Sequence, residues 1–415
     1  MEQEPTVAAE KPDHNTFSGL TDWRLVGDRG SAWFDAPSQL VGAALVGRLT
    51  QLAPADSRPD FDLRAGGVRV RIAPDPAVAE AISTAAADLG LRSDPSALAE
   101  LGLVFESTRP TVVRSFWQRA LDHHELSDGR LADRVRRDPT VRFDRLAASQ
   151  PRDNRLHIDV GAPSTRVDSV RESLGQRPHG PFGVALADAD GNEVDLCPGG
   201  MLSGGPQTSD WQTMFSALAF YPVTDAGRAA ALVTAVAELA DQAGRPLLID
   251  VRPEGVMIDS GKDQWEIPTG ADPEFVELAT RIQSAARAAG LAADPGPYRF
   301  VQIGITATDI PAVRAFWSRT LGYVDDPRPM VTDLYDPRRL NPVIFFQSQE
   351  DADPDRRSHP NRLHLELSLP ADRIDLLVRT GLAAGGRLLA DQRPAGAQEA
   401  TLADPEGNEL RLTGS

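Results

Sequence analysis

The segment Asn361-Arg362-Leu363-His364-Leu365-Glu366-Leu367 is followed by Ala403-Asp404-Pro405-Glu406-Gly407-Asn408-Glu409-Leu410-Arg411, and this pair of segments decides the fold. The same order occurs earlier in the chain, as Asn154-Arg155-Leu156-His157-Ile158-Asp159-Val160 and then Ala187-Asp188-Ala189-Asp190-Gly191-Asn192-Glu193-Val194-Asp195. Each first segment alternates polar and apolar residues, which is typical of a β-strand. Each second segment is an acidic Gly-Asn turn that opens another strand, which is typical of a hairpin.

A repeat runs through the whole chain. Residues 313–321, Val-Arg-Ala-Phe-Trp-Ser-Arg-Thr-Leu, are identical to residues 113–121 at six of nine positions. Asp210-Trp211 corresponds to Asp22-Trp23, and a helix expected over residues 227–242 corresponds to one expected over 37–52. The sequence therefore predicts a tandem duplication of a two-domain unit of about 200 residues.

Composition narrows the class of protein. A chain of 415 residues is too long for one core and suggests roughly two to four domains. No apolar run is long enough to span a bilayer, and the acidic start lacks the pattern of a secretory signal. The single cysteine, Cys197, excludes an internal disulfide and suits a reducing cytoplasm. The formal net charge of -17 argues against a nucleic-acid or anionic-membrane partner.

The expected organisation is a chain of the α+β class with four domains. The boundaries are a disordered tail over 1–16, domains over 17–92 and 100–198, a Gly- and Pro-rich linker over 199–208, and domains over 209–290 and 298–415.

Residues 101–198 and 300–413 resemble the glyoxalase-like branch of the vicinal oxygen chelate superfamily, which also includes bleomycin-resistance and dioxygenase proteins. The residues responsible are the Phe-Trp helix, the Arg-Leu-His strand and the acidic Gly-Asn-Glu hairpin. The resemblance implies paired βαβββ modules whose curled sheets enclose a cavity, often with a divalent metal.

Residues 17–92 and 209–290 resemble pterin-4a-carbinolamine dehydratase domains, with an antiparallel sheet and helices. The usual His-His-Pro is Ser57-Arg58-Pro59 in the first and Gly244-Arg245-Pro246 in the second, so both catalytic histidines are missing twice. A hydroxyl or a guanidinium cannot shuttle protons near neutral pH as an imidazole does. We therefore expect degenerate domains that serve packing, pairing or ligand shape.

Alternation sorts the histidine strands into two faces. Arg155, His157 and Asp159 share one face of the first strand, and Arg362 and His364 share the corresponding face of the second. Composition alone would place these polar faces in water. The superfamily resemblance implies instead that cup-shaped sheets turn them inward around a ligand.

In metal-binding relatives the ligands lie on the first and last strands of each module. If each cup closes within its own domain, the sets are His157 with Asp195, and Gln302 with His364. If the two copies pair as glyoxalase subunits do, one shared site gathers Gln302, His157 and Asp195, and the other holds His364 with Arg411. The first shared set suits Zn, Ni, Mn or Fe, whereas an arginine at a ligand position suits an anionic substrate.

The first functional hypothesis is an enzyme of specialised metabolism, an isomerase, lyase or cyclase that transfers a proton on a small organic molecule. His157, His364 and Asp195 are the expected catalytic residues. The expected substrate contacts are Gln302, Arg155, Arg362, Arg411, Glu193 and Glu409. The alternative is a protein that binds or sequesters a small molecule without turnover, as resistance proteins of this superfamily do. A third, structural hypothesis makes the dehydratase-like domains pairing modules, with pseudo-dimeric pairing inside one chain and a homodimer left open.

Overall fold

The computed structural model describes residues 16–50, 58–148, 154–328, 331–348, 361–395 and 398–414, and the structural statements below concern these residues. The tail expected over 1–16 lies outside them except for Thr16, and so does Ser57. No helix within the described ranges has the length and apolar character needed to cross a bilayer.

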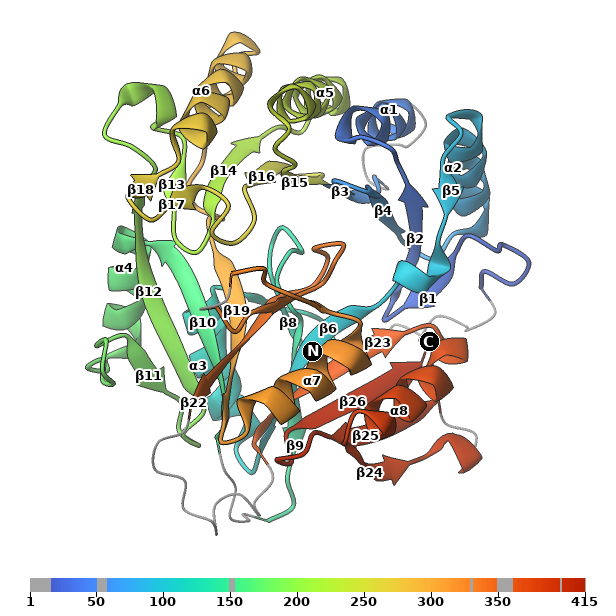
Figure 1. The fold of residues 1–415 in the computed structure, drawn as a ribbon, viewed down its shortest axis with the longest axis vertical. Helices are drawn as coiled ribbons and strands as arrows, with labels where there is room; N and C mark the ends of the chain where they lie inside the picture. The colour runs from blue at the N-terminus through green and yellow to red at the C-terminus, as the bar shows by residue number, and fades with distance from the viewer. Residues whose placement is uncertain are drawn as a thin grey trace, which may run out of the picture.

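The larger of two main sheets begins with an antiparallel part at the top of Figure 1, which we call the upper sheet. Its strands, in spatial order, are β1 (Arg24–Val26), β2 (Arg29–Asp35), β4 (Gly67–Ile72), β3 (Asp60–Arg64), β15 (Leu248–Arg252), β16 (Gly255–Asp259), β14 (Ala217–Pro222) and β13 (Gln212–Thr213). The short β5 (Arg92–Ser93) pairs with β2. Strands β3 and β15 meet at the centre with Asp62 opposite Asp250, so the N- and C-terminal halves of the chain form one sheet.

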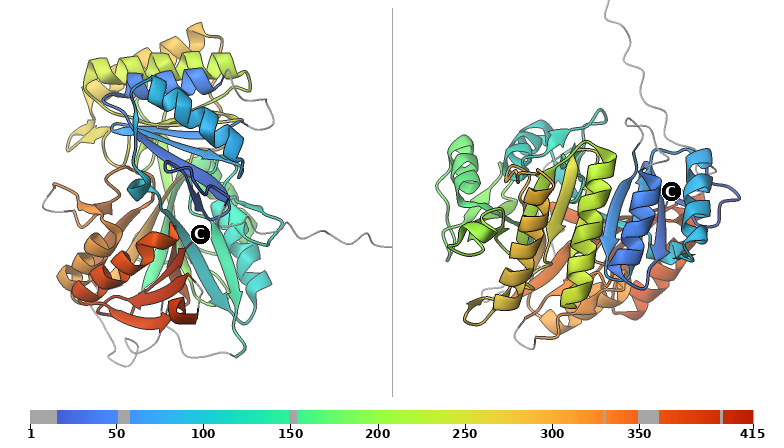
Figure 2. Two further views of the ribbon diagram at one scale, coloured as in Figure 1. Left: turned by 90° about the vertical axis from the view of Figure 1, so that its right-hand side faces the viewer. Right: turned by 90° about the horizontal axis from the view of Figure 1, so that it is seen from above.

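Four helices lie side by side over the outer face of the upper sheet (Figures 1 and 2). They are α1 (Gln39–Leu49), α2 (Pro76–Asp88), α5 (Ala226–Ala243) and α6 (Pro273–Ala288). Asp75 and Asp272 cap α2 and α6 by accepting hydrogen bonds from the backbone, and a proline fills the first helical position of each. One apolar core joins all four helices to the sheet.

The larger sheet continues from the upper sheet into six further strands, with β11 (Ala185–Ala187) at the side of the first. In spatial order they are β12 (Glu193–Met201), β10 (Leu156–Pro163), β19 (Phe300–Ala307), β22 (Val343–Ser348), β21 (Leu334–Tyr335) and β20 (Val324–Asp325). The second main sheet contains β24 (Arg387–Asp391), β25 (Glu399–Ala403), β26 (Glu409–Gly414), β23 (Leu363–Leu369), β6 (Glu100–Ser107), β9 (Val141–Arg145), β8 (Leu131–Ala132) and β7 (His124–Glu125). A small hairpin is formed by β17 (Glu266–Ile267) and β18 (Gly270–Ala271).

Both halves of the chain contribute strands to each of these lower sheets. Strand β10 of the N-terminal half pairs antiparallel with β19 of the C-terminal half, and β23 pairs in the same way with β6. This is the second of the two expected arrangements, in which the halves share their sites. Helices α3 (Pro110–Leu121), α4 (Ser164–Leu174), α7 (Ile310–Leu321) and α8 (Ile374–Ala383) pack on the apolar faces and enclose one common core.

Each acidic hairpin is bound to the Phe-Trp helix of its own half of the chain. Asp404 accepts hydrogen bonds from the side chain and backbone of Asn408 and from the indole of Trp317 at 3.0 Å. Asp188 makes the same contacts with Asn192 and with Trp117. The aspartate that closes each hairpin thus anchors the Phe-Trp helix, and both tryptophans are fully buried as core packing predicts.

The linker expected over 199–208 begins inside a strand, because residues 199–201 complete β12, and Gly200 and Met201 pair with β13. A Cβ atom on Gly199 would lie 2.3 Å from the carbonyl oxygen of Thr213. The glycine therefore serves a close approach between two backbones, and not flexibility. As a result β12 runs without a break from the lower sheet to the upper sheet.

Candidate functional site

Four polar side chains converge on one face of β12, β10 and β19, which we call the His157 face. Asp159 on β10 lies opposite Gln302 on β19 and opposite Asp195 on β12, and His157 lies two residues before Asp159. Because alternate residues share a face and neighbouring strands are about 4.8 Å apart, this register brings the four side chains together. Their apolar neighbours Leu156 and Ile158 point the other way, into the core.

The distances define a compact cluster. The Gln302 amide donates a hydrogen bond of 2.9 Å to Asp159, and His157 Nε2 lies 3.5 Å from Asp159 Oδ1. One nitrogen of His157 and one carboxylate oxygen each of Asp159 and Asp195 all lie within 4.8 Å of one another. His157, Asp159 and Gln302 are buried, whereas Asp195 is half-buried and faces the solvent side of the cluster.

A glycine makes room for the imidazole. Gly304 on β19 lies opposite His157, and a Cβ atom at this position would come within 2.1 Å of the ring. On its other side the ring packs edge-on against Phe345 of β22, with ring centroids 5.4 Å apart. The histidine is therefore held flat over the backbone of β19.

Burial and crowding of like charges shift the pKa values of the cluster. Burial raises the pKa of Asp159 to about 6, although the hydrogen bond from Gln302 and the charge of Lys262 oppose it. Burial and the neighbouring Asp159 raise the pKa of Asp195 to about 6 as well. Burial lowers the pKa of His157, against the charges of Asp195 and Glu193. Near neutral pH the cluster thus holds a neutral imidazole between two carboxylates that bind protons more strongly than usual.

The residues present fit a divalent cation. Asp159 Oδ1, Asp195 Oδ1 and Gln302 Oε1 are buried oxygen atoms that accept no hydrogen bond, and all three belong to this cluster. Buried acceptors without a donor are costly, and a cation would satisfy them together. One imidazole with carboxylate and amide oxygens is a donor set that Zn, Ni, Mn and Fe accept.

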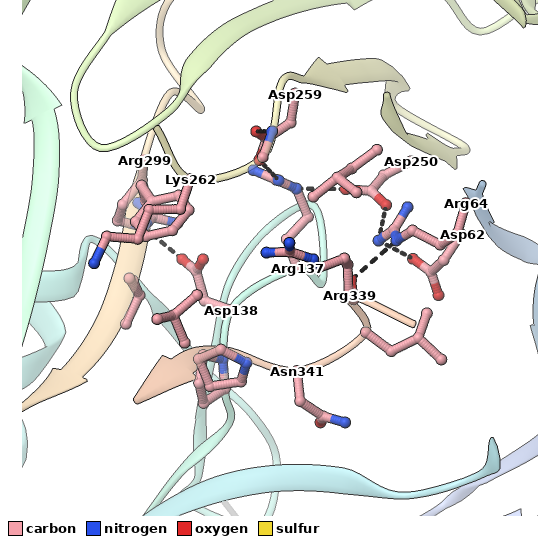
Figure 3. Close-up of a pocket in the computed structure, with 18 of the residues that line it drawn as sticks. Asp62, Arg64, Arg137, Asp138, Asp250, Asp259, Lys262, Arg299, Arg339 and Asn341 are labelled. Carbon is pink, nitrogen blue, oxygen red and sulfur yellow. Dashed lines mark hydrogen bonds and ion pairs between the residues drawn. The ribbon is translucent and has the colours of Figure 1, made fainter. Parts of the chain in front are cut away.

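A loop of the upper sheet lies against the His157 face. Lys262, from the loop between β16 and β17 and labelled in Figure 3, forms an ion pair with Asp333, and the charges of both residues act on Asp159. Its ammonium group lies 5.6 Å from the ring centroid of Phe345 and 5.8 Å from that of Phe215. Asp159, Lys262 and Asp333 are site residues that the sequence analysis did not select. Strand alternation had placed Asp159 on the same face as His157. No sequence pattern connected Lys262 or Asp333 to the site.

The corresponding His364 face, on β26, β23, β6 and β9, has a different chemistry. Arg142 binds Glu366 at 2.9 Å, and Arg411 binds Asp144 at 3.1 Å. His364 is fully buried beside them. Arg411 therefore has a carboxylate partner within the protein, and its role as the contact for an anionic substrate stays a prediction.

Two further arginines that the sequence predicts as substrate contacts bind groups within the protein. Arg155 is buried and donates from Nε to Asn408 at 3.0 Å, and Arg362 donates to the carbonyl oxygen of Asp190 at 2.6 Å. Each arginine therefore binds the acidic hairpin of the other half of the chain and joins the two halves. Glu193 and Glu409 are both half-buried at the start of the last strands, and Glu193 lies opposite His157.

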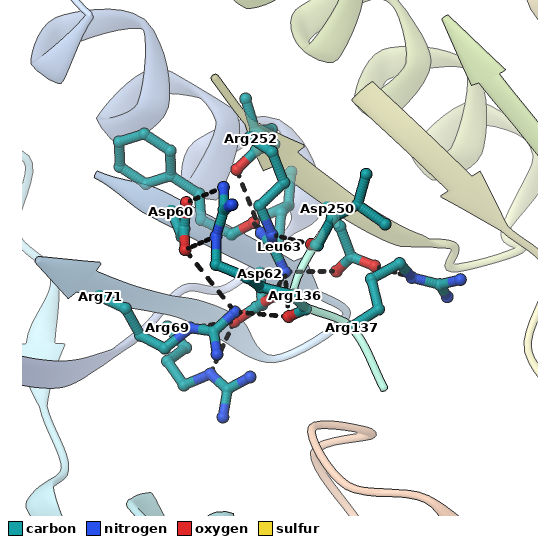
Figure 4. Close-up of polar contacts among 12 residues, drawn as sticks. Asp60, Asp62, Leu63, Arg69, Arg71, Arg136, Arg137, Asp250 and Arg252 are labelled. Atoms are coloured by element: carbon teal, nitrogen blue, oxygen red, sulfur yellow. Dashed lines mark hydrogen bonds and ion pairs between the residues drawn. The ribbon is translucent and has the colours of Figure 1, made fainter. Parts of the chain in front are cut away.

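A buried network of arginines and aspartates fills the centre of the inner face of the upper sheet (Figure 4). Arg252 binds Asp62 at 2.5 Å, and Arg64 binds Asp250 at 2.7 Å. Burial by itself would raise the pKa of Asp62, but Arg252 and the neighbouring Arg69 hold it well below its usual range. The network fixes the upper sheet to the loops that rise from the lower sheets.

Comparisons with known proteins identify the class. Residues 102–197 and 302–413 match the family model of the glyoxalase-like domain, and together they make up just over half of the chain. The chain therefore belongs to the glyoxalase-like domain family of the vicinal oxygen chelate superfamily. The match includes neither 17–92 nor 209–290, so their resemblance to pterin dehydratases and the duplication of the whole unit stay predictions.

Several solved structures are similar to the chain at low identity. Glyoxalase I from Zea mays is 8% identical, and the match covers 76% of this chain and 93% of that protein with a TM-score of 0.33. A hypothetical protein from S. aureus is 16% identical over 27% of this chain and 90% of that protein, with a TM-score of 0.22. A search of curated proteins gives no match.

Proposed function

We propose that the chain is a small-molecule enzyme whose His157 face binds a divalent cation and transfers a proton on its substrate. The observation that carries the proposal is that one nitrogen of His157 and one carboxylate oxygen each of Asp159 and Asp195 lie within 4.8 Å of one another, while each carboxylate has a buried oxygen that accepts no hydrogen bond. The His364 face is not proposed as a cation site, because ion pairs already neutralise its charged side chains. We place one site in the chain, at the junction of its two halves.

The residues have separate tasks. His157, Asp159, Asp195 and Gln302 would hold the ion, which when bound supplies a Lewis acid that polarises a substrate oxygen. The lowered pKa of His157 keeps its imidazole neutral near pH 7, so an unprotonated nitrogen is present. The carboxylate of the half-buried Asp195 could accept a proton from an incoming substrate and return it at another position. Lys262 and Phe345 exclude water from the buried side.

Calorimetric titration of the chelator-treated protein with Mn²⁺ and Zn²⁺ tests the cation site. We expect one ion per chain for the wild type, and loss of binding in both His157→Gln and Asp195→Asn. Glu366→Gln is the matched control, since it alters the His364 face and should leave the stoichiometry at one. Equal binding by wild type and Asp195→Asn, or no ion bound by the wild type, would overturn the proposed site.

Solvent-deuterium incorporation tests the proton transfer. Proton NMR in D₂O follows exchange at the carbon next to the carbonyl in a panel of small hydroxy- and ketocarbonyl compounds. We expect at least one compound to exchange faster with the wild type than with Asp195→Asn. Ion binding without exchange across the panel would contradict the enzyme proposal and favour the binding alternative.

A further inference from the structure

Two arginines occupy the same position in the two loops that rise towards the upper sheet. Arg136 lies five residues after Leu131 and five before its strand partner Val141, and Arg339 has the same spacing between Leu334 and Ile344. Both have left-handed backbone conformations, with φ of 52° for Arg136 and 54° for Arg339. This conformation is uncommon for residues other than glycine and often marks a constrained functional position.

The guanidinium groups of these two arginines have different surroundings. Arg136 is paired, with Asp60 at 2.8 Å and Glu254 at 3.0 Å. Arg339 forms no ion pair or side-chain hydrogen bond with any residue in the described part of the chain. Its guanidinium lies over the ring of Tyr335, 3.5 Å from the centroid, and its carbonyl oxygen accepts a hydrogen bond of 3.0 Å from Arg64. Burial lowers the pKa of Arg339, although Tyr335 and the charges of Asp326, Asp336 and Asp259 oppose the shift.

Arg339 lines a cavity of about 580 Å³ between the upper sheet and the loop over residues 335–339. This volume lies within the usual range for sites that bind small organic molecules. The lining includes Trp33, Phe275 and Tyr335. Arg339 also lines the adjoining smaller pocket, where Figure 3 shows it beside Arg64.

The other arginines of the cavity already have carboxylate partners. Arg64 binds Asp250, Arg245 binds Asp272 and Glu274, and Arg338 binds Asp94. Among the described residues that line the cavity, Arg339 is the cation that has no such partner. A guanidinium that stacks on an aromatic ring keeps its edge available for two parallel hydrogen bonds to an oxyanion.

We propose that this cavity binds a small organic anion, with a carboxylate or phosphate group on Arg339 and an apolar body against the half-buried side chains of Tyr335 and Leu248. The cavity shares no lining residue with the cluster of the His157 face, so the inference does not depend on the proposed enzyme. The net negative charge of the chain would repel such a ligand elsewhere on the surface. The positive charge of Arg339 therefore makes this cavity the place where a small anion is attracted.

Isothermal titration with benzoate, phenyl phosphate and benzamide tests the inference, because the three share a ring and differ in the group offered to Arg339. A fragment of this size that fits its site should bind with a Kd of about 10 mM or tighter. We expect benzoate or phenyl phosphate to bind, the stronger of the two identifying the oxyanion, and benzamide not to bind. Benzamide binding as well as benzoate, or no anion binding to the wild type at that concentration, would overturn the inference.

Arg339→Asn and Arg136→Asn form a matched pair, because asparagine tolerates the left-handed conformation at both positions. Arg339→Asn should keep its thermal stability and bind the anion about tenfold to a hundredfold more weakly. Arg136→Asn should unfold at a lower temperature, because the buried Asp60 loses its nearest cationic partner, and should bind the anion as the wild type does. Unchanged affinity in a folded Arg339→Asn variant would contradict the proposal.

Discussion

Replacing Gly304 with alanine should move His157 out of the cluster. The new methyl group would lie 2.1 Å from Cε1 and 2.3 Å from Nε2 of the imidazole, far inside van der Waals contact. Phe345, the partner of Gly304 on β22, packs edge-on against the ring and limits its sideways movement. Overpacking of this kind costs about 1–3 kcal/mol of unfolding free energy. The imidazole then leaves the position that we assign to a ligand, so cation affinity should fall tenfold or more.

Urea unfolding and Mn²⁺ titration measure the two effects of Gly304→Ala separately. Gly102→Ala is the control, since Gly102 lies on β6 in the other lower sheet and the atom nearest to a new Cβ is 3.3 Å away. We expect Gly102→Ala to change the free energy of unfolding by less and to leave ion binding intact. A Gly304→Ala variant that binds Mn²⁺ as tightly as the wild type would refute the assignment of His157 as a ligand.

Three further predictions concern charge. Asp62→Ala should lower the free energy of unfolding by about 3–5 kcal/mol, because it removes the carboxylate nearest to the fully buried Arg252. The control Asp88→Ala, at an exposed ion pair, should lower it by about 0–1 kcal/mol, and urea titration compares the two variants. Mn²⁺ affinity should fall as the pH drops through about 6, because Asp159 and Asp195 then bind protons; a flat calorimetric profile between pH 5 and 7 would contradict this. Without metal, these raised pKa values stabilise the fold below about pH 4, and the contribution is lost as the pH rises through about 6; Asp159→Asn should flatten that part of the urea stability profile.

The sequence was sufficient to predict which side chains share a face. Strand alternation placed His157 and Asp159 on one side of β10, and the resemblance to glyoxalases brought Gln302 and Asp195 to them, as the strand register shows. Only the structure reveals that the halves exchange strands, because both arrangements satisfy the same alternation.

Several features of the site and the fold could not be predicted from the sequence, for physical reasons. Arg155 and Arg362 have the parity of the polar faces, but each lies at the entrance of its strand, where the hairpin of the other half covers it. The role of Lys262 depends on a contact between the upper sheet and a distant lower sheet, which no local pattern encodes. The Gly-Gly pair at 199–200 is equally common in linkers and where two backbones come close, and composition does not distinguish these cases.

The exchange of strands between the halves has a consequence for biosynthesis. His157 and Asp195 leave the ribosome long before Gln302 and Phe345. Until β19 and β22 are synthesised, the N-terminal half therefore exposes Asp159, Asp195 and the unpaired edge of β10. The nascent chain must keep this edge from aggregating until β19 and β22 are synthesised. Completion of the site is therefore a late event in folding, which requires that the chain has been synthesised as far as β22.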